Sequence, residues 1–121
     1  MAAHEYLQGE QLSMFIPARE LMNYTAGHPE NYGDEYLLLS KSPGVLKQKL
    51  KESKEVPAHG MYTGLLQPGQ ETMYQSIAKK GVVTSVSLKI RKNDVQIDDG
   101  HHRIASAHDI DPNMEIPVRY S

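Results

Sequence analysis

The chain has 121 residues, of which 39% are apolar and 23% charged, with one phenylalanine and no tryptophan. A chain of this length forms a single domain, residues 1–121, whose core has to be built from leucine, isoleucine, valine, methionine and tyrosine. The net charge of −2 is not that of a protein that holds nucleic acid by bulk positive charge, and the absence of cysteine excludes disulfides, thiolate nucleophiles and cysteine-ligated metals.

The first part of the chain predicts one short strand and one short helix around a long loop. Residues 1–11 are polar, and we expect them to be loosely held. Residues 12–16 have the composition of a strand, and Pro17 suits the first turn of a helix because its missing N–H would be unpaired there anyway. Residues 25–40, rich in glycine, proline and tyrosine, predict a long ordered loop.

Two helices are predicted in the middle of the chain. Ser42 followed by Pro43 is typical of a helix start, and the apolar spacing carries this helix to Ser53. Residues 56–70 contain prolines and glycines and predict another loop. A further helix is expected over 71–80, with Gly81 as its C-terminal cap.

The last third of the chain has the most regular pattern. Alternating apolar residues predict strands over 86–90 and 95–97, and the second strand is expected to break at 98–100. The spacing over 101–109 fits a helix, and alternation over 116–120 predicts a final strand.

These elements predict an α+β fold with a small mixed β-sheet, packed helices and the Gly100 turn at one edge of the sheet. Pro117 favours an edge position for the last strand, because proline cannot donate to a ladder. The first five residues lack the basic and apolar regions of a signal peptide. No apolar run approaches the roughly 18 residues of a membrane span. We therefore expect a cytoplasmic protein with no membrane partner.

Chemically versatile side chains gather at the turn between the predicted strand and helix. In order they are Asp98, Asp99, Gly100, His101, His102 and Arg103. Glycine lets the backbone approach a ligand, and the free N–H groups of a first helical turn face an anion in front of them. Arg103 can bind a phosphate with two hydrogen bonds, and His101 and His102 can donate, accept or relay a proton. The turn therefore predicts a phosphate site formed by Gly100, His101, His102 and Arg103.

An enzymatic interpretation and a purely structural one stay open beside this site. Asp98 and Asp99 could hold Mg²⁺ between carboxylate and phosphate, with Asp99, His101 and His102 as catalytic residues. In the structural interpretation, the glycine merely forms a turn, an aspartate caps the helix and Arg103 pairs with a nearby aspartate.

Four phrases of the sequence resemble the ParB-like N-terminal domain, in the same order and at plausible spacing over residues 73–120. They are Ser76-Ile77-Ala78-Lys79-Lys80-Gly81-Val82, Val86-Ser87-Leu88, Asp99-Gly100-His101-His102-Arg103-Ile104-Ala105-Ser106-Ala107 and Ile116-Pro117-Val118. The resemblance implies a ParB/sulfiredoxin-like fold. The stretch from Phe15 to Leu21 and the lysine-rich helix that follows are also similar to compact ParB-like proteins of actinobacterial phages.

The resemblance implies several chemistries, because this superfamily hosts more than one activity on one fold. In partition ParB proteins the Gly-x-x-Arg turn binds the triphosphate of CTP, which would make Gly100 and Arg103 phosphate contacts here. The partition proteins usually have Glu-Arg where this chain has His101-His102. Sulfiredoxins need a cysteine that this chain lacks. Free-serine kinases have a turn similar to Asp99-Gly100-His101, and nuclease members would use Asp98, Asp99 and a histidine on a divalent metal.

Three functions are therefore expected as alternatives. The first is a binding module for a nucleotide, as nucleoside triphosphate with Mg²⁺, or for DNA. The second is a metal-dependent nuclease or a nucleotide-using phosphotransferase. The third is a phage-type protein that binds a host protein with the ancestral site inactive. The oligomeric state stays open.

Basic residues offer a second reason to consider DNA. They are Lys47, Lys51, Lys54, Lys79, Lys80, Lys89, Arg91 and Lys92. These residues could form one basic face, or they could simply be solvated side chains at the surface.

Overall fold

A computed structural model describes residues 14–26, 38–58, 66–91 and 93–121 of the chain. The polar segment 1–11 and most of the predicted loop over 25–40 lie outside these residues.

Five strands form one mixed sheet in the order β1-β5-β3-β4-β2. They are β1 (Met14–Pro17), β2 (Thr25–Ala26), β3 (Val86–Arg91), β4 (Asp94–Asp99) and β5 (Glu115–Tyr120). β1 and β5 are antiparallel, as are β3 and β4, whereas β5 runs parallel to β3 and β2 runs parallel to β4. The predicted α+β fold with a small mixed sheet is confirmed.

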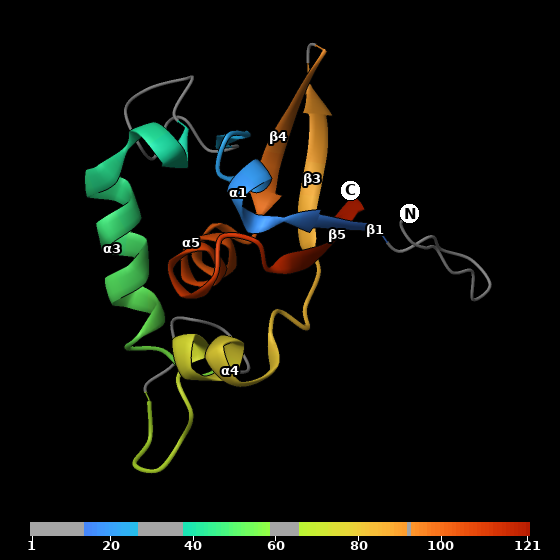
Figure 1. Cartoon of the computed structure of the whole chain (residues 1–121). Coiled ribbons are helices and arrows are strands. Elements are labelled where there is room, and N and C mark those ends of the chain that lie inside the picture. Colours follow the sequence, from blue (N-terminus) through green and yellow to red (C-terminus); the bar gives the residue numbers. More distant parts are fainter. Residues whose placement is uncertain (1–13, 27–37, 59–65, 92) are drawn as a thin grey trace, which may run out of the picture.

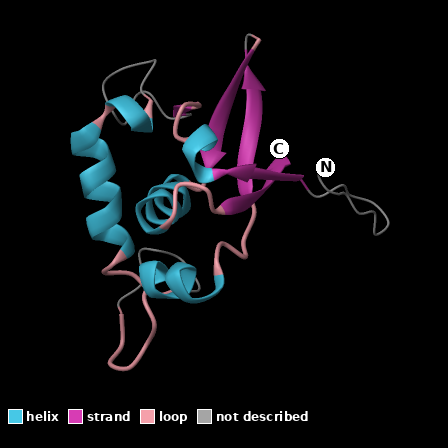
Figure 2. Ribbon diagram, viewed as in Figure 1, coloured by secondary structure: helices cyan, strands magenta, loops and turns pink. Residues whose placement is uncertain are grey.

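The helices gather on one side of this sheet (Figures 1 and 2). They are α1 (Ala18–Leu21), the 3₁₀ helix η1 (Leu39–Lys41), α3 (Pro43–Ser53), α4 (Met73–Lys80) and α5 (His101–Ile110). α5 occupies the centre, where it contacts α1, α3, α4 and β3. The predicted helix starting at Pro43 is confirmed, and so is the predicted helix that begins directly after Gly100.

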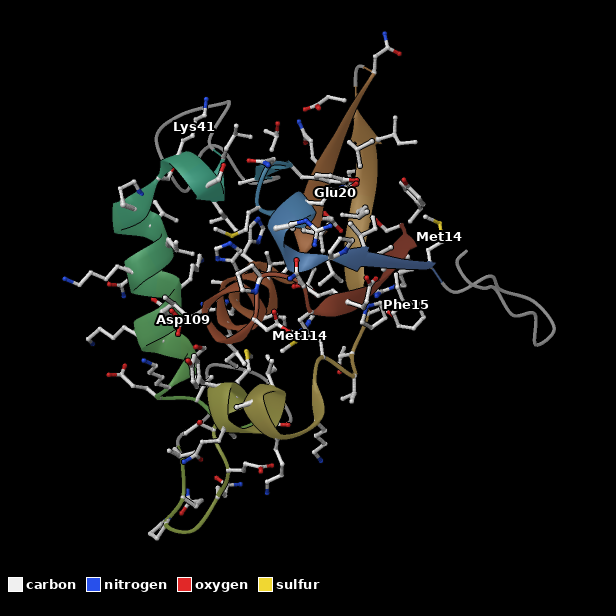
Figure 3. The ribbon with its side chains drawn as sticks, in the orientation of Figure 1. Met14, Phe15, Glu20, Lys41, Asp109 and Met114 are labelled. Atoms are coloured by element: carbon white, nitrogen blue, oxygen red, sulfur yellow. The ribbon has the colours of Figure 1, made fainter. Side chains whose placement is uncertain are left out.

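The core lies between α5 and the sheet. Ile104 of α5, Leu88 of β3, Ile97 of β4 and Ile116 of β5 are all fully buried. Because side chains alternate between the two faces of a strand, the residues at even spacing in each strand supply this layer. In β1 the alternation is visible directly, since Met14 and Phe15 point to opposite sides of the strand (Figure 3).

α4 shows why its predicted boundaries hold to within two residues. The side chain of Thr72 accepts a hydrogen bond from the backbone N–H of Gln75, whose own side chain accepts from the N–H of Thr72. This capping box fixes the first turn at Met73. Gly81, with a φ of 77°, ends the helix as predicted.

Three expectations about the strands were wrong. β2 falls in the predicted loop, and this two-residue strand is defined by its parallel pairing with Gln96 and Ile97 of β4. β4 continues through Asp98 and Asp99, because Asp99 still pairs with Ser87 of β3, while Asp98 lies at an irregularity between this pair and the pair Leu88–Ile97. β5 is not an edge strand, although β3 pairs with it only from Val118 onward, which leaves Pro117 with β1 alone.

Candidate functional site

Gly100 joins β4 to α5 in a conformation that other residues rarely adopt. Its φ is 119° and its ψ is 17°, so the backbone turns sharply before His101 starts the helix. A Cβ atom at this position would lie 2.7 Å from Cγ2 of Val86. The lack of a side chain at Gly100 therefore lets the backbone lie close to Val86 of β3, and the start of α5 packs against the sheet.

Arg103 lies in the first turn of α5, and 19% of its side chain is exposed. One guanidinium nitrogen, Nη2, donates to the carbonyl oxygen of Ser85 over 3.3 Å. The same nitrogen is 3.6 Å from Oδ2 of Asp99, whose side chain is 72% exposed. Nε of Arg103 is buried and has no hydrogen-bond partner among the described residues. A mostly buried positive charge is thus only partly satisfied here.

A pocket of about 220 Å³ opens beside Arg103. Its walls come from Ala58, from α4, from the segment 81–84 that leads to β3, and from Arg103 itself. Ser76, Thr84 and Arg103 are the residues of this lining that have polar side chains. Ser76 and Gly81 belong to one of the phrases that carry the family resemblance, and Arg103 belongs to another. The fold brings these separated segments to the same pocket.

The four predicted phosphate contacts do not share this pocket. Of these four residues, Arg103 lines the described wall of the pocket, whereas Gly100, His101 and His102 do not. Gly100 packs against Val86, and His101 is only 6% exposed at the start of α5. His102 points to α3 instead. A helix rotates about 100° per residue, so consecutive residues of the first turn have to face different neighbours.

His102 forms a short hydrogen bond with Glu52 of α3. Its Nε2 lies 2.6 Å from Oε1 of Glu52, and 13% of its side chain is exposed. Burial lowers the pKa of His102, although the contact with Glu52 opposes this shift. Partial burial would raise the pKa of Glu52, but hydrogen bonds from Gln48 and His102 outweigh it and hold that pKa below its ordinary value. Both directions fit a neutral imidazole that donates its N–H to a carboxylate.

The predicted magnesium ligands already have cationic neighbours. Oδ1 of Asp98 is 3.1 Å from Nζ of Lys89, and its other oxygen accepts from Ser121 over 3.4 Å. Asp99 lies beside Arg103. Within the described ranges, no group of three histidine or acidic side chains is arranged to hold a metal ion. Binding of Mg²⁺ between these carboxylates and a phosphate stays a prediction, since Mg²⁺ is usually held by one or two carboxylates together with phosphates of the ligand.

Arg119 of β5 is a site residue that the sequence analysis missed. Its Nη1 donates to the carbonyl of Ser85 over 3.2 Å, which is the acceptor that Arg103 also uses. The parallel pairing of β5 with β3 sets Arg119 opposite Ser87. The sequence near Arg119 does not predict this contact, because the contact depends on how two strands distant in sequence pair.

Several lysines of the predicted basic face have partners at the surface. Nζ of Lys51 lies 3.2 Å from Glu55, and Nζ of Lys79 lies 2.7 Å from Glu71. Lys54 lies over the ring of Tyr74, 4.7 Å from its centre. Together with the Lys89–Asp98 pair, these contacts favour solvated, locally neutralised surfaces over one continuous basic face.

No family model, curated protein or solved structure matches this chain. Membership of the ParB-like superfamily therefore stays a prediction from the sequence phrases. Among the described helices, none is long and apolar enough to cross a bilayer.

Proposed function

We propose that this protein is a ParB-like binding module that takes a phosphate group of a nucleotide in the Arg103 pocket. The observation that carries the proposal is the mostly buried guanidinium of Arg103 on the pocket wall. Among the described residues, this guanidinium donates a hydrogen bond to a neutral carbonyl and has one exposed carboxylate 3.6 Å away, beyond hydrogen-bond distance. Hydrogen bonds from arginine to phosphate are charge-assisted and stronger than those to neutral acceptors, so a phosphate would satisfy this group better.

The size of the pocket suits a phosphate and the groups next to it. Pockets that enclose drug-sized ligands measure roughly 300–1,000 Å³, whereas this one measures about 220 Å³. A bound nucleoside triphosphate would therefore leave part of its length outside. A short pocket with a local positive charge suits a nucleotide better than a long DNA backbone, which needs many phosphate contacts along its path.

Binding without fast turnover is the form of the proposal that the geometry supports best. His102 is engaged by Glu52 on the α3 side of α5, and Asp98 is engaged by Lys89. A nuclease or phosphotransferase would need these groups to converge on the phosphate. The enzyme and the host-protein-binding alternatives have no comparable observation in their favour.

Thermal stability with and without ligands tests the proposal. The panel consists of CTP, ATP, GTP and UTP, each with and without Mg²⁺, and a short duplex DNA. A ligand that binds only the folded state, present at about 100 times its dissociation constant, stabilises by roughly 2.7 kcal/mol, which raises Tm by several degrees in a chain of this size. We expect such a shift with a nucleotide, smaller at high salt.

Two variants connect that shift to the pocket. Arg103→Gln keeps a donor for the Ser85 carbonyl and removes the charge, so it should fold and lose the nucleotide-induced shift. Arg19→Ala, which removes an exposed arginine from α1, should keep the shift. A shift that survives in Arg103→Gln would contradict the proposal. A wild-type protein that responds to none of the ligands would favour the host-protein-binding alternative.

A further inference from the structure

Two arginines from different elements meet at one backbone atom. Nη2 of Arg103 and Nη1 of Arg119 lie 3.3 and 3.2 Å from the carbonyl oxygen of Ser85. The distance between Nη2 of Arg103 and Nη1 of Arg119 therefore cannot exceed the sum of these two distances. Ser85 directly follows Thr84, which lines the pocket, so the arginine pair lies at the rim of the pocket.

The charge at this rim is not balanced within the described part of the chain. Arg119 is exposed and forms no ion pair with a described carboxylate, while Arg103 has Asp99 at 3.6 Å. The neighbouring pair Lys89–Asp98 is neutral in sum. Two guanidinium groups thus have one carboxylate beside them, at Arg103, and this carboxylate is mostly exposed. Like charges held this close repel each other unless an anion lies between them.

We propose that Arg119 is a second anion-binding residue, which together with Arg103 holds a terminal phosphate or polyphosphate at the mouth of the pocket. This inference rests on the proposed phosphate site and adds a residue and a ligand class to it. A terminal phosphate carries about two negative charges near neutral pH, which matches two guanidinium groups. Each phosphate of a nucleic-acid backbone is a diester with a single charge, which one arginine already matches.

The Ser85 carbonyl and Asp99 have defined parts in this arrangement. The carbonyl is a neutral acceptor that keeps both guanidinium groups side by side before the ligand arrives, which lowers the ordering cost of binding. Asp99 competes with the ligand for Arg103, because its carboxylate occupies the same charged donor. Removal of the Asp99 charge should therefore strengthen anion binding.

Isothermal titration calorimetry with inorganic tripolyphosphate tests the role of Arg119. Loss of one charge-assisted contact weakens binding about ten-fold or more, so Arg119→Ala should show this loss. Arg119→Gln, which keeps a donor for Ser85, should show a similar loss and decides the matter if the alanine variant unfolds. Asp99→Asn should bind several-fold more tightly, because the competing carboxylate is gone.

The matched control is Arg19→Ala, which also removes one exposed arginine. Arg19 lies two residues after Pro17 of β1, and Pro17 pairs with Glu115 of β5. Glu115 and Arg119 stand at opposite ends of β5, and at the rise of a strand their Cα atoms are about 13 Å apart. Tripolyphosphate affinity should stay within about two-fold in this variant, since exposed charges at this distance are largely screened. A loss as large as in Arg119→Ala would mean that only net charge matters.

The outcomes separate the inference from the function on which it rests. If Arg103→Gln weakens tripolyphosphate binding and both Arg119 variants do not, the role of Arg119 is overturned and the Arg103 pocket stands. If wild-type protein binds neither tripolyphosphate nor a nucleotide, both fall. An oligonucleotide without terminal phosphates, in which every phosphate is a diester, tests the ligand class. If Arg119→Ala weakens its binding as much as that of tripolyphosphate, the preference for terminal phosphates is wrong.

Discussion

Gly100 is the residue on which two independent constraints act at once. Its φ of 119° lies in the left-handed region, where a side chain is strained whatever the space around it. In addition, a Cβ atom would approach Val86 to 2.7 Å, which a packed core does not accommodate without movement. The start of α5, and with it Arg103, is positioned by this contact.

Gly100→Ala should therefore destabilise the fold by about 2–5 kcal/mol, from backbone strain and overpacking together. Gly69→Ala is the matched control, because Gly69 has a similar positive φ of 84° and open space around its Cα. That variant should lose only about 1–2 kcal/mol. Urea denaturation of both variants measures the difference. Equal losses would mean that the contact with Val86 contributes nothing.

Sequence reasoning finds site residues only where a local pattern announces them. Gly100 and Arg103 stand in a strand-turn-helix phrase, so both were predicted. Glu52 and Arg119 were not, because their contacts cross 50 residues to His102 and 34 residues to Ser85. Such contacts follow from how helices and strands pack in three dimensions. The sequence around a glutamate or an arginine does not indicate which distant residue it contacts.

The elements divide in the same way. α3 was predicted from the serine and proline at its start, α4 from the glycine that ends it, and β3 from the alternation of its apolar residues. β2 and η1 have two and three residues, too few for any period to appear. Their structure depends on partners, and for β2 the partner is β4, some seventy residues further along the chain.

The contact between α3 and α5 should depend on Glu52. Glu52→Ala removes the acceptor of a mostly buried N–H of His102, and an unsatisfied polar group of this kind costs about 1–3 kcal/mol. Urea denaturation at pH 7.5 measures the loss. We expect the nucleotide-induced rise in Tm to persist in this variant, because His102 faces away from the Arg103 pocket.

Glu55→Ala is the control for that prediction. Glu55 lies on the same helix and pairs with Lys51 over 3.2 Å, but both side chains are more than half exposed. Exposed pairs of this kind contribute about 0–1 kcal/mol, so this variant should stay close to wild type. If Glu52→Ala is equally mild, the bond to His102 is not a stabilising link between the helices.

At the scale of the whole molecule, the central helix α5 connects α3 with the Arg103 pocket. α5 contacts α3 through His102 on one side and presents Arg103 to the pocket on another. β1 pairs with β5 at the edge of the sheet, and β5 pairs with β3, which places Arg119 next to Ser85. The C-terminal strand β5 therefore contributes Arg119 to the rim of the pocket, and the N-terminal strand β1 pairs with β5.

The buried His102 should make the stability of the whole molecule depend on pH. Its pKa in the folded state lies below the ordinary value of 6.5, because burial disfavours the charged imidazolium. Below about pH 6.5 the unfolded chain therefore binds more protons at this residue than the folded chain does. The free energy of unfolding has to decrease as the pH falls through this range. Glu52 acts in the same direction at lower pH, since its folded pKa lies below 4.5.

Urea denaturation at pH 7.5 and pH 5.5 isolates the contribution of His102, because the contribution of Glu52 is still present at both values. Wild-type protein should be less stable at pH 5.5. His102→Gln keeps a donor for Glu52 and cannot be protonated, so its stability should change less between the two pH values. An equal change in both proteins would show that other groups cause the pH dependence. A rise in wild-type stability on acidification would mean that His102 is charged in the fold and bound to Glu52 as an ion pair.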